Sequence, residues 1–433
     1  MEEYKITKPI RLIELFAGIG TQAMAFRDLN AEFERWKTCE WDYHAILSYA
    51  AIHCADDIND YSRGLDDYDV SMYLFCKGIS SDGKKPMSYE QVKRLPKGKK
   101  RRIYNAIFAT VNLVNIETIK ADDLEIVDTD RYCYVMTYSF PCQDISIAGK
   151  SGGMEKGSGT RSSLLWEVER ILLELRERNE LPQVLLMENV PEVIRMKNYQ
   201  HFMKWYKSLE GMGYQSYYKL LNAKDYGVPQ SRNRCFMISV LGDYDYDFPA
   251  PVELTKCLRD VLEPVVNEKY YLPDERVKEL LYKGNIKTED DIANMVRTSG
   301  RGSAERHAWD LVTVKQIGNC MPTRTRDNPN QGRVYATEGL SPSLNCMEGG
   351  NRQPFILVRH QADNTLLCDG DNGIVDVHRI RRLTPLESWR LMGFSDEDFY
   401  KAQAVNSNTQ LYKQAGNSIV KQVLMALINT MLM

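Results

Sequence analysis

The sequence lacks several patterns that would assign the chain to a class at once. No apolar run reaches the ~18 residues of a membrane-spanning helix, and the opening residues, Met-Glu-Glu-Tyr-Lys, include no apolar segment of the kind that directs secretion. None of the ten cysteines forms a C-x-x-C pair, which argues against a zinc ribbon and a thioredoxin-like redox site. We therefore expect free thiols in a reducing cytoplasm, no membrane segment and no metal site.

A strong excess of charge of either sign is also missing. Lys plus Arg is 56 and Asp plus Glu is 59, which gives a formal net charge of -3. A nucleic-acid partner would therefore require a basic surface that is local. The chain has 433 residues and is 43% hydrophobic, so it can bury a substantial core. At roughly 100–200 residues per domain, this length predicts two or three domains, or one large domain with an insertion.

Strand and helix patterns alternate from residue 10 to residue 240. Residues 10–16 are typical of a buried strand, and a glycine loop and a helical pattern follow directly. Further apolar strands are predicted at residues 132–138 and 184–187. This alternation predicts an α/β domain with a parallel sheet. Residues 56–110 are less regular, and we interpret them as a solvated insertion; their basic end leaves a phosphate-contacting patch as the alternative.

The remainder of the chain divides into two parts. Residues from about 250 to 377 are rich in Gly, Asn, Pro and Arg and show no repeated long helix, whereas helical patterns return near the C-terminus. We predict a catalytic and cofactor-binding domain at residues 8–248, with its insertion at about 56–110. A smaller irregular domain follows at residues 249–377, and residues 378–433 return to pack on the first domain.

The first motif with chemical meaning is a glycine loop between a strand and a helix. Gly18 and Gly20 permit a tight turn and the close approach of a nucleotide-like ligand. Glu40 ends the next strand, where an acid suits the hydroxyls of a ribose. Trp41 beside it could stack on an adenine. The motif predicts an adenosine-cofactor site, although the residues alone leave open which adenosine cofactor is bound.

Two further motifs follow the predicted strands at 132–138 and 184–187. Pro141-Cys142-Gln143 precedes a glycine-rich loop, which suits a covalent nucleophile under a mobile lid. The alternative for Cys142 is a buried strand-end cysteine. Glu188 also falls at a strand end, where a raised pKa would make its carboxyl a proton donor. An acid that caps the next turn is an equal alternative for Glu188.

The last two motifs contain arginines and a polar turn. Gln230, Arg232 and Arg234 alternate on one face of a predicted strand, where two arginines require carboxylates or an anionic ligand. The alternative is an exposed edge strand. Gln414-Ala415-Gly416-Asn417-Ser418 precedes the last helical pattern, and its simplest interpretation is a helix cap supplied by Asn417 or Ser418.

Taken in this order, the motifs closely resemble those of the DNA cytosine-5 methyltransferases. Phe16–Gly20 resembles the cofactor loop, Pro141-Cys142-Gln143 the nucleophile motif and Glu188-Asn189-Val190 the proton-donor motif. The segment from Gln230 to Arg234 resembles the base-contacting strand, and Gly416-Asn417-Ser418 the closing motif. Where the family has Gly-Asp-Ile before the nucleophile strand, the nearest match is Val114-Asn115-Ile116. Ser343 stands where the family has a threonine, which keeps the hydroxyl.

The resemblance implies a fold, a cofactor and a reaction. The fold is a Rossmann-like S-adenosylmethionine-dependent methyltransferase domain with a second, smaller target-recognition domain. The reaction is transfer of a methyl group from S-adenosylmethionine to C5 of a flipped-out cytosine, through an adduct between Cys142 and C6. Glu188 would act on N3, and Arg234 would hold O2 with Arg232 nearby. The implied cofactor-binding residues are Phe16, Gly18, Gly20, Glu40, Trp41, Asn115 and Asn417.

The same resemblance implies the partners of the chain. We expect a cytoplasmic monomer that acts on double-stranded DNA and is nucleoid-associated through it, and we leave open a cognate restriction endonuclease acting separately. Seven Lys or Arg residues between 297 and 333 make the recognition region locally basic. The nearest rival is an RNA cytosine-5 methyltransferase on the same scaffold. A catalytically inactive DNA-binding protein and a dinucleotide oxidoreductase are the rivals from other classes.

Overall fold

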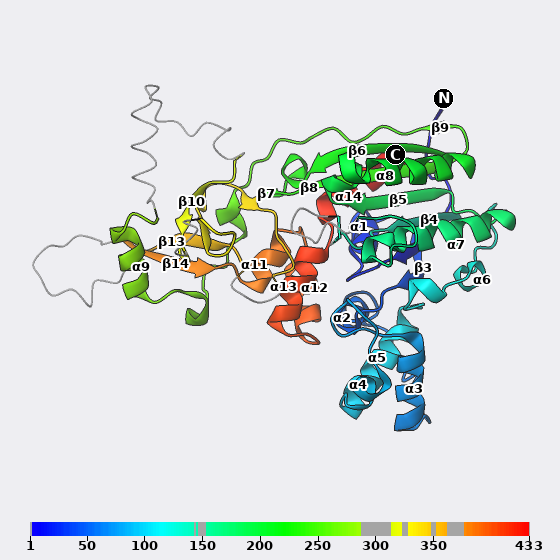
Figure 1. Ribbon diagram of the computed structural model, residues 1–433, viewed down its shortest axis with the longest axis horizontal. Helices are drawn as coiled ribbons and strands as arrows, with labels where there is room; N and C mark the ends of the chain where they lie inside the picture. The colour runs from blue at the N-terminus through cyan, green and yellow to red at the C-terminus, as the bar shows by residue number, and fades with distance from the viewer. Residues whose placement is uncertain are drawn as a thin grey trace, which may run out of the picture.

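A six-stranded sheet forms the centre of the larger part of the molecule (Figure 1). The computed structural model describes residues 2–142, 144–145, 153–286, 313–322, 328–347, 352–361 and 376–432. In sheet order the strands are β3 (Phe33–Cys39), β2 (Ile10–Leu15), β4 (Cys133–Tyr138), β5 (Val184–Asn189), β8 (Asn233–Leu241) and β6 (Tyr214–Asn222). The first four are parallel to one another, β8 runs antiparallel to both of its neighbours, β5 and β6, and β6 forms the edge. The predicted α/β fold class is confirmed.

Helices cover both faces of this sheet. Ile10 and Leu12 of β2 point into the core beneath α1 and α14, whereas Ile13 and Leu15 point into the opposite core beneath α7 and α8. The bounds of these helices are Thr21–Asp28 for α1, Lys421–Leu432 for α14, Leu165–Glu177 for α7 and Met196–Gly211 for α8. The C-terminal helix thus packs against the first helix of the chain.

The strand order identifies the edge of the sheet where a ligand is expected. The chain adds β3 on one side of β2 and then adds β4 on the other side. In open α/β sheets, ligands bind beyond the carboxyl ends of the strands at such a switch point. The Phe16–Gly20 loop leaves β2 at this edge, and Pro141-Cys142 leaves β4 at the same edge.

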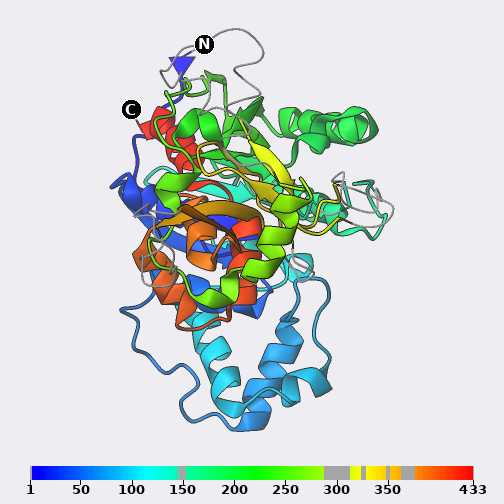
Figure 2. The same ribbon diagram turned by 90° about the vertical axis from the view of Figure 1, so that its left-hand side faces the viewer.

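The segment at residues 56–110 is a helical subdomain, which corrects the prediction of a less regular, solvated insertion. The segment contains α3 (Asp67–Lys77), α4 (Tyr89–Lys93) and α5 (Lys97–Ala109), which share an apolar core with α2 (Tyr43–His53). Part of its basic stretch is buried: Lys100 is 1% exposed and forms an ion pair with Asp67. Figures 1 and 2 both show these helices projecting from the bottom of the molecule.

A second, smaller sheet organises the region after residue 250. Its strands, in order, are β10 (Gln316–Asn319), β11 (Arg333–Tyr335), β13 (Phe355–Gln361) and β14 (Asp376–Arg382). The helix α9 (Asp274–Tyr282) packs on this sheet through Val277 and Leu280. The boundary predicted between residues 377 and 378 falls inside β14. Because β14 pairs with β13 over its whole length, residues 378–382 belong to the smaller sheet. Two-stranded pairings also join β1 (Glu2–Glu3) to β9 (Tyr244–Asp245) and β7 (Gln230–Ser231) to β12 (Ser341–Pro342).

The C-terminal segment returns to the larger sheet through four helices. These are α11 (Pro385–Arg390), α12 (Asp396–Gln403), α13 (Asn408–Asn417) and α14. A capping box starts α11, because the Thr384 hydroxyl accepts a hydrogen bond from the Glu387 backbone N–H and the Glu387 carboxylate accepts one from the Thr384 N–H. One prediction is wrong here. Asn417 and Ser418 end α13 rather than open the last helix, which starts at Lys421.

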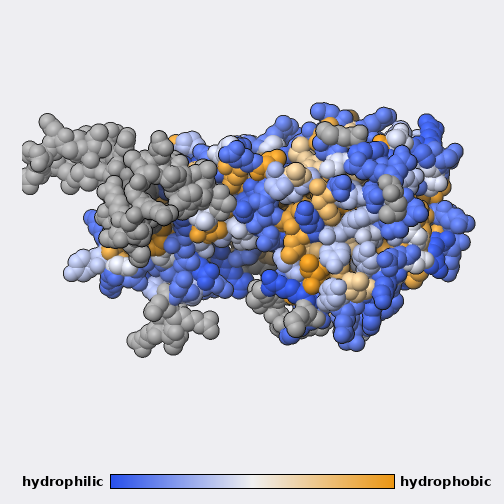
Figure 3. Space-filling view, turned by 90° about the horizontal axis from the view of Figure 1, so that it is seen from above, coloured by the Kyte–Doolittle hydropathy of each residue, from blue (hydrophilic) through white to orange (hydrophobic). Residues whose placement is uncertain are grey.

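The surface seen from above the molecule is mainly hydrophilic. Figure 3 shows apolar side chains there in small groups among hydrophilic ones. Among the residues that the structure describes, none of the helices combines the length and apolar character that crossing a bilayer requires. All nine cysteines in the described ranges are free, and five of them are buried. The prediction of free thiols therefore holds for these nine.

Candidate active site

The glycine loop after β2 rests on α2 and is open on its other side. Gly18 and Gly20 have φ angles of 57° and 78°, and Phe16 also has a positive φ of 59°. A Cβ at Gly20 would overlap the side chains of Tyr49 and His53, whereas a Cβ at Gly18 would meet open space. Glycine is therefore required at position 20 for packing and at both positions for the backbone turn. The open side leaves room for a ligand close to the backbone.

Glu40 lies directly against this loop. One carboxylate oxygen, Oε2, accepts a hydrogen bond from the Gly18 N–H at 2.9 Å, and Oε1 accepts one from the Asp42 N–H at 2.8 Å. Removal from water raises the pKa of Glu40 to about 7, and the neighbouring Asp42 charge contributes to the increase. Trp41 is half-buried and packs on the apolar core of the helical subdomain. The loop, the acid and the indole are thus together, as their motif predicts.

Two asparagines near the start of η1 (Ile116–Thr118) have different roles in the structure. Asn115 caps η1, because its side chain accepts a hydrogen bond from the Glu117 N–H. Asn112 instead bonds the backbone of Glu40 twice, with its Oδ1 accepting from the Glu40 N–H and its Nδ2 donating to the Glu40 carbonyl, each at 3.0 Å. Sequence reasoning missed Asn112, and the cofactor contact of Asn115 stays a prediction.

The Cys142 turn is held by two side chains from other elements. The Asn189 Nδ2 donates to the Phe140 carbonyl at 3.0 Å, and the Ser162 hydroxyl donates to the Pro141 carbonyl at 2.7 Å. These bonds fix the backbone on the N-terminal side of Cys142, which is half-buried. Gln143 and residues 146–152 of the glycine-rich loop lie outside the described residues. Sequence reasoning assigned no role to Asn189 or Ser162, although Asn189 lies within the Glu188-Asn189-Val190 motif.

Glu188 and Arg234 meet beside Cys142. Glu188 ends β5, and its Oε1 lies 3.1 Å from Nε of Arg234 on the adjacent strand β8. Burial raises the pKa of Glu188, and the two nearby arginines oppose this increase. Burial also raises the pKa of the Cys142 thiol, with Arg234 opposing and Glu188 adding to the effect. Because β8 lies between β5 and β6, Arg234 is not on an exposed edge strand.

Arg232 is buried and bonded to backbone from distant parts of the chain. Its Nη1 donates to the Leu344 carbonyl at 2.8 Å, and its Nη2 donates to the carbonyls of Gly416 and Ser418, each at 2.9 Å. Its Nε has no hydrogen-bond partner among the described residues. Burial, together with the charge of Arg234, lowers the pKa of Arg232 to about 9. The side chain thus connects the strand region to the loop that follows β12 and to the end of α13.

The closing motif lies against the loop that follows β12. A Cβ at Gly416 would overlap the backbone of Asn345, so only glycine permits this approach. Asn417, the last residue of α13, accepts a hydrogen bond from the Cys346 thiol through its Oδ1 at 2.8 Å. Cys346 is also near enough to Cys142 to contribute to the raised pKa of that thiol, so the closing motif lies close to the Cys142 region.

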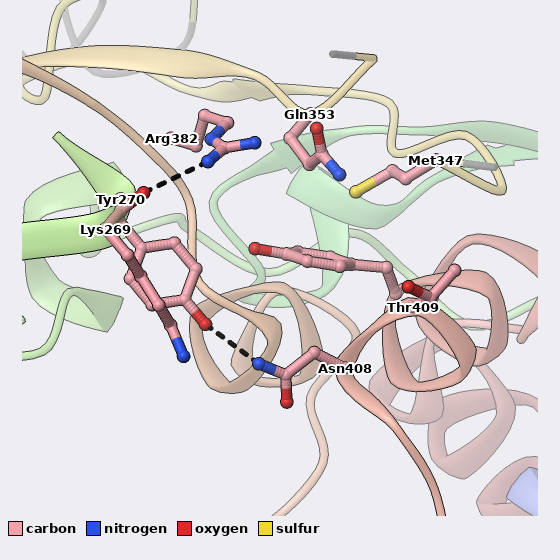
Figure 4. A pocket seen from close by; sticks show the side chains of 8 residues that line it. Lys269, Tyr270, Met347, Gln353, Arg382, Asn408 and Thr409 are labelled. Atoms are coloured by element: carbon pink, nitrogen blue, oxygen red, sulfur yellow. Dashed lines mark hydrogen bonds between the residues drawn. The ribbon is translucent and has the colours of Figure 1, made fainter. Parts of the chain in front are cut away.

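A separate cavity of about 300 Å³ lies between the smaller sheet region and α13 (Figure 4). Asn408 donates to the Tyr270 hydroxyl across it, and Arg382 donates to the Lys269 carbonyl. None of the predicted site residues lines this cavity; its lining residues are Lys269, Tyr270, Met347, Gln353, Arg382, Asn408, Thr409 and Tyr412. The predicted residues gather instead at the carboxyl edge of the large sheet.

The fold is the Rossmann-like fold of the S-adenosylmethionine-dependent methyltransferases. A sequence model of the C-5 cytosine-specific DNA methylases matches residues 97–433. The chain is 32% identical to the type II methyltransferase M2.ScrFI of Lactococcus lactis subsp. cremoris, over 96% of this chain and 98% of that protein. It is also 32% identical to the orphan methyltransferase M.SssI of Spiroplasma monobiae, over 98% and 97%. The chain belongs to the C-5 cytosine-specific DNA methylases.

Solved structures support the fold assignment. The Entamoeba histolytica methyltransferase EhMeth superposes with a TM-score of 0.56 at 15% identity, with 98% of each chain covered. At this identity the likeness shows the fold only. The enzyme is thus a DNA (cytosine-5) methyltransferase that uses S-adenosylmethionine, as the sequence motifs predict.

Proposed function

We propose that Cys142 is the nucleophile that adds to C6 of the target cytosine. Bound S-adenosylmethionine would supply the activated methyl group from its sulfonium, leaving S-adenosylhomocysteine. Addition of the thiolate to C6 makes C5 nucleophilic, so that C5 can accept the methyl group. A base then removes the C5 proton, and β-elimination releases the Cys142 thiolate and restores the aromatic ring. The observation that carries this proposal is the cluster of Cys142, Glu188 and Arg234 at the carboxyl edge of the sheet.

Glu188 and Arg234 would stabilise the adduct. Burial raises the pKa of Glu188, which favours the protonated carboxyl that can donate to N3 of cytosine. Arg234, whose Nε is 3.1 Å from this carboxylate, would donate to O2 from the same side. Because C5 and C6 are inaccessible inside a duplex, the base would be flipped out into this site. Arg232 would hold the surrounding backbone in place, since its hydrogen bonds go to three carbonyls.

The remaining assignments concern the cofactor and the partner. We propose that Phe16, Gly18, Gly20, Glu40 and Trp41 bind S-adenosylmethionine, with Asn115 and Asn417 as further contacts. The region at 249–377 would recognise double-stranded DNA and the rest of the chain would carry out catalysis, in a monomer acting on DNA in the cytoplasm and nucleoid. A separate cognate restriction endonuclease would fit the type II name of the relative M2.ScrFI.

The choice between DNA and RNA has a direct test. Methyl transfer from labelled S-adenosylmethionine is compared on a cytosine-containing DNA duplex and on tRNA at equal cytosine concentration. We expect labelling of the duplex at C5 and only background labelling of the tRNA. Preferential labelling of tRNA would instead favour the RNA methyltransferase alternative.

Trp41→Ala should weaken cofactor binding. Loss of one stacking contact costs about 1–3 kcal/mol, so the dissociation constant of S-adenosylmethionine should rise by roughly 5- to 150-fold. Calorimetric titration of the purified protein measures this change. Trp36→Ala is a matched control, because Trp36 donates to the Leu124 carbonyl from the outer strand β3 rather than from the Glu40 turn. An unchanged dissociation constant in Trp41→Ala would contradict the assignment.

Cofactor affinity should also depend on pH. The pKa of Glu40 is raised to about 7, so its carboxylate becomes protonated as the pH falls through that value. A protonated carboxyl accepts hydrogen bonds less well, and the cofactor's ribose hydroxyls would lose part of their acceptor. Binding should therefore be weaker at pH 6 than at pH 8, and Glu40→Gln should remove most of this difference. Equal pH dependence in Glu40→Gln would assign the effect to another group.

A further inference from the structure

Lys413 is a buried lysine that the proposed mechanism does not use. It lies in α13 and is 8% exposed. Its Nζ donates to Oδ2 of Asp42 at 2.9 Å and to the Asp82 carbonyl at 2.7 Å. Asp42 follows the Glu40-Trp41 pair directly, and Asp82 belongs to the helical subdomain. One ammonium group therefore connects the C-terminal segment to two elements beside the proposed cofactor site.

The connection continues through Asp42 to the glycine loop. The Asp42 backbone N–H donates to Oε1 of Glu40 at 2.8 Å, and Oε2 of Glu40 accepts from the Gly18 N–H at 2.9 Å. The second carboxylate oxygen of Asp42, Oδ1, accepts from the His44 N–H and caps α2. An uninterrupted series of contacts thus runs from Lys413 through Asp42 and Glu40 to Gly18.

We propose that Lys413 is a positioning residue for S-adenosylmethionine, which sets the orientation of the Glu40 carboxylate through Asp42. The proposal rests on the proposed function, because it takes Glu40 as the ribose-binding acid. Lys413 fixes the Asp42 side chain, and so fixes the backbone N–H that holds Glu40. It also neutralises the Asp42 charge, which otherwise disfavours a charged Glu40 carboxylate beside it.

The position of α13 explains how Lys413, far along the chain, can contact Asp42. Figure 1 shows α12 and α13 beside α2. Gln414 of α13 donates to the His44 carbonyl, and Asn406, between α12 and α13, donates to the hydroxyl of Ser48. The same helix ends at Asn417, next to Cys346. One rigid element thereby contacts both the cofactor turn and the neighbourhood of Cys142.

Lys413→Met tests the proposal, because methionine keeps most of the volume and removes the ammonium group. We expect the dissociation constant of S-adenosylmethionine to rise about tenfold or more, the scale of a lost charged hydrogen bond. The single-turnover rate at saturating cofactor and the DNA dissociation constant should stay within about threefold of wild type. Asp42→Asn combined with Lys413→Met should recover part of the affinity, because the buried Asp42 charge is then removed as well.

Lys421→Met is the matched control. Lys421 is likewise buried, and its Nζ donates to Asp28 at 2.5 Å, but this pair joins α14 to the end of α1. It should lower thermal stability without changing cofactor affinity. If Lys413→Met binds the cofactor as tightly as Lys421→Met does, Lys413 only stabilises the fold and the inference is wrong. If Glu40→Gln also binds the cofactor as wild type does, the failure lies with the proposed cofactor site itself.

Discussion

Cys142→Ala is expected to abolish methyl transfer while DNA binding is retained. Without the thiolate, C5 of cytosine stays a poor nucleophile, and loss of an enzyme nucleophile lowers rates by about 10⁴-fold or more. The variant should also form no covalent adduct with a duplex that contains 5-fluorocytosine at the target, because fluorine blocks the elimination step only after the thiolate has added. Denaturing electrophoresis of the trapped complex measures this.

Cys346→Ala separates Cys142 from its nearest competitor for the role. Cys346 lies close enough to contribute to the raised pKa of the Cys142 thiol, and its own thiol donates to Asn417. Its alanine variant should still form the adduct. A trapped complex in Cys142→Ala, or none in the wild type, would overturn the assignment of the nucleophile.

Glu188→Gln should lower the single-turnover methylation rate by about 10²–10⁴-fold, the usual contribution of general acid–base catalysis. Glutamine keeps the size of the side chain and a hydrogen-bond donor, but it cannot deliver a proton as a carboxylic acid does. DNA affinity should hardly change, because most of it comes from contacts with phosphates. Rapid-quench measurement of the rate, with DNA binding measured in parallel, tests both expectations.

The outcomes for Glu188 distinguish three roles. A wild-type rate in Glu188→Gln would exclude proton donation. Equal losses of rate and of DNA binding would mean that Glu188 acts structurally, through its contact with Arg234. A large loss of rate with unchanged DNA binding is the result that the proposed mechanism requires.

The large sheet and the position of its site were predictable because the signals are local. Cys142 follows β4 and Glu188 lies at the end of β5, so the two must lie at the same edge once these strands are parallel. The Glu40 contact with Gly18 follows for the same reason, since β2 and β3 are adjacent. The resemblance to a family then indicated the chemistry that we propose for this edge.

The remaining features depend on contacts between residues far apart in the chain. The helical subdomain can bury Lys100 because Asp67 and Ser71 bind its ammonium group, whereas a lysine-rich stretch by itself indicates a solvated surface. The three carbonyls that bind Arg232 come from residues more than 100 positions away. The Gly416-Asn417-Ser418 segment suits the start or the end of a helix equally well. In the structure it ends α13, where Gly416 lies against the backbone of Asn345.

Base-resolution sequencing of 5-methylcytosine in the DNA of a host that lacks other cytosine methylation, and that expresses this chain, tests the central claim most directly. Wild-type protein is predicted to place 5-methylcytosine at one recurring DNA sequence, and Cys142→Ala is predicted to place none. Absence of 5-methylcytosine with soluble wild-type protein, or equal methylation with Cys142→Ala, would contradict the assignment of a DNA cytosine-5 methyltransferase that acts through Cys142.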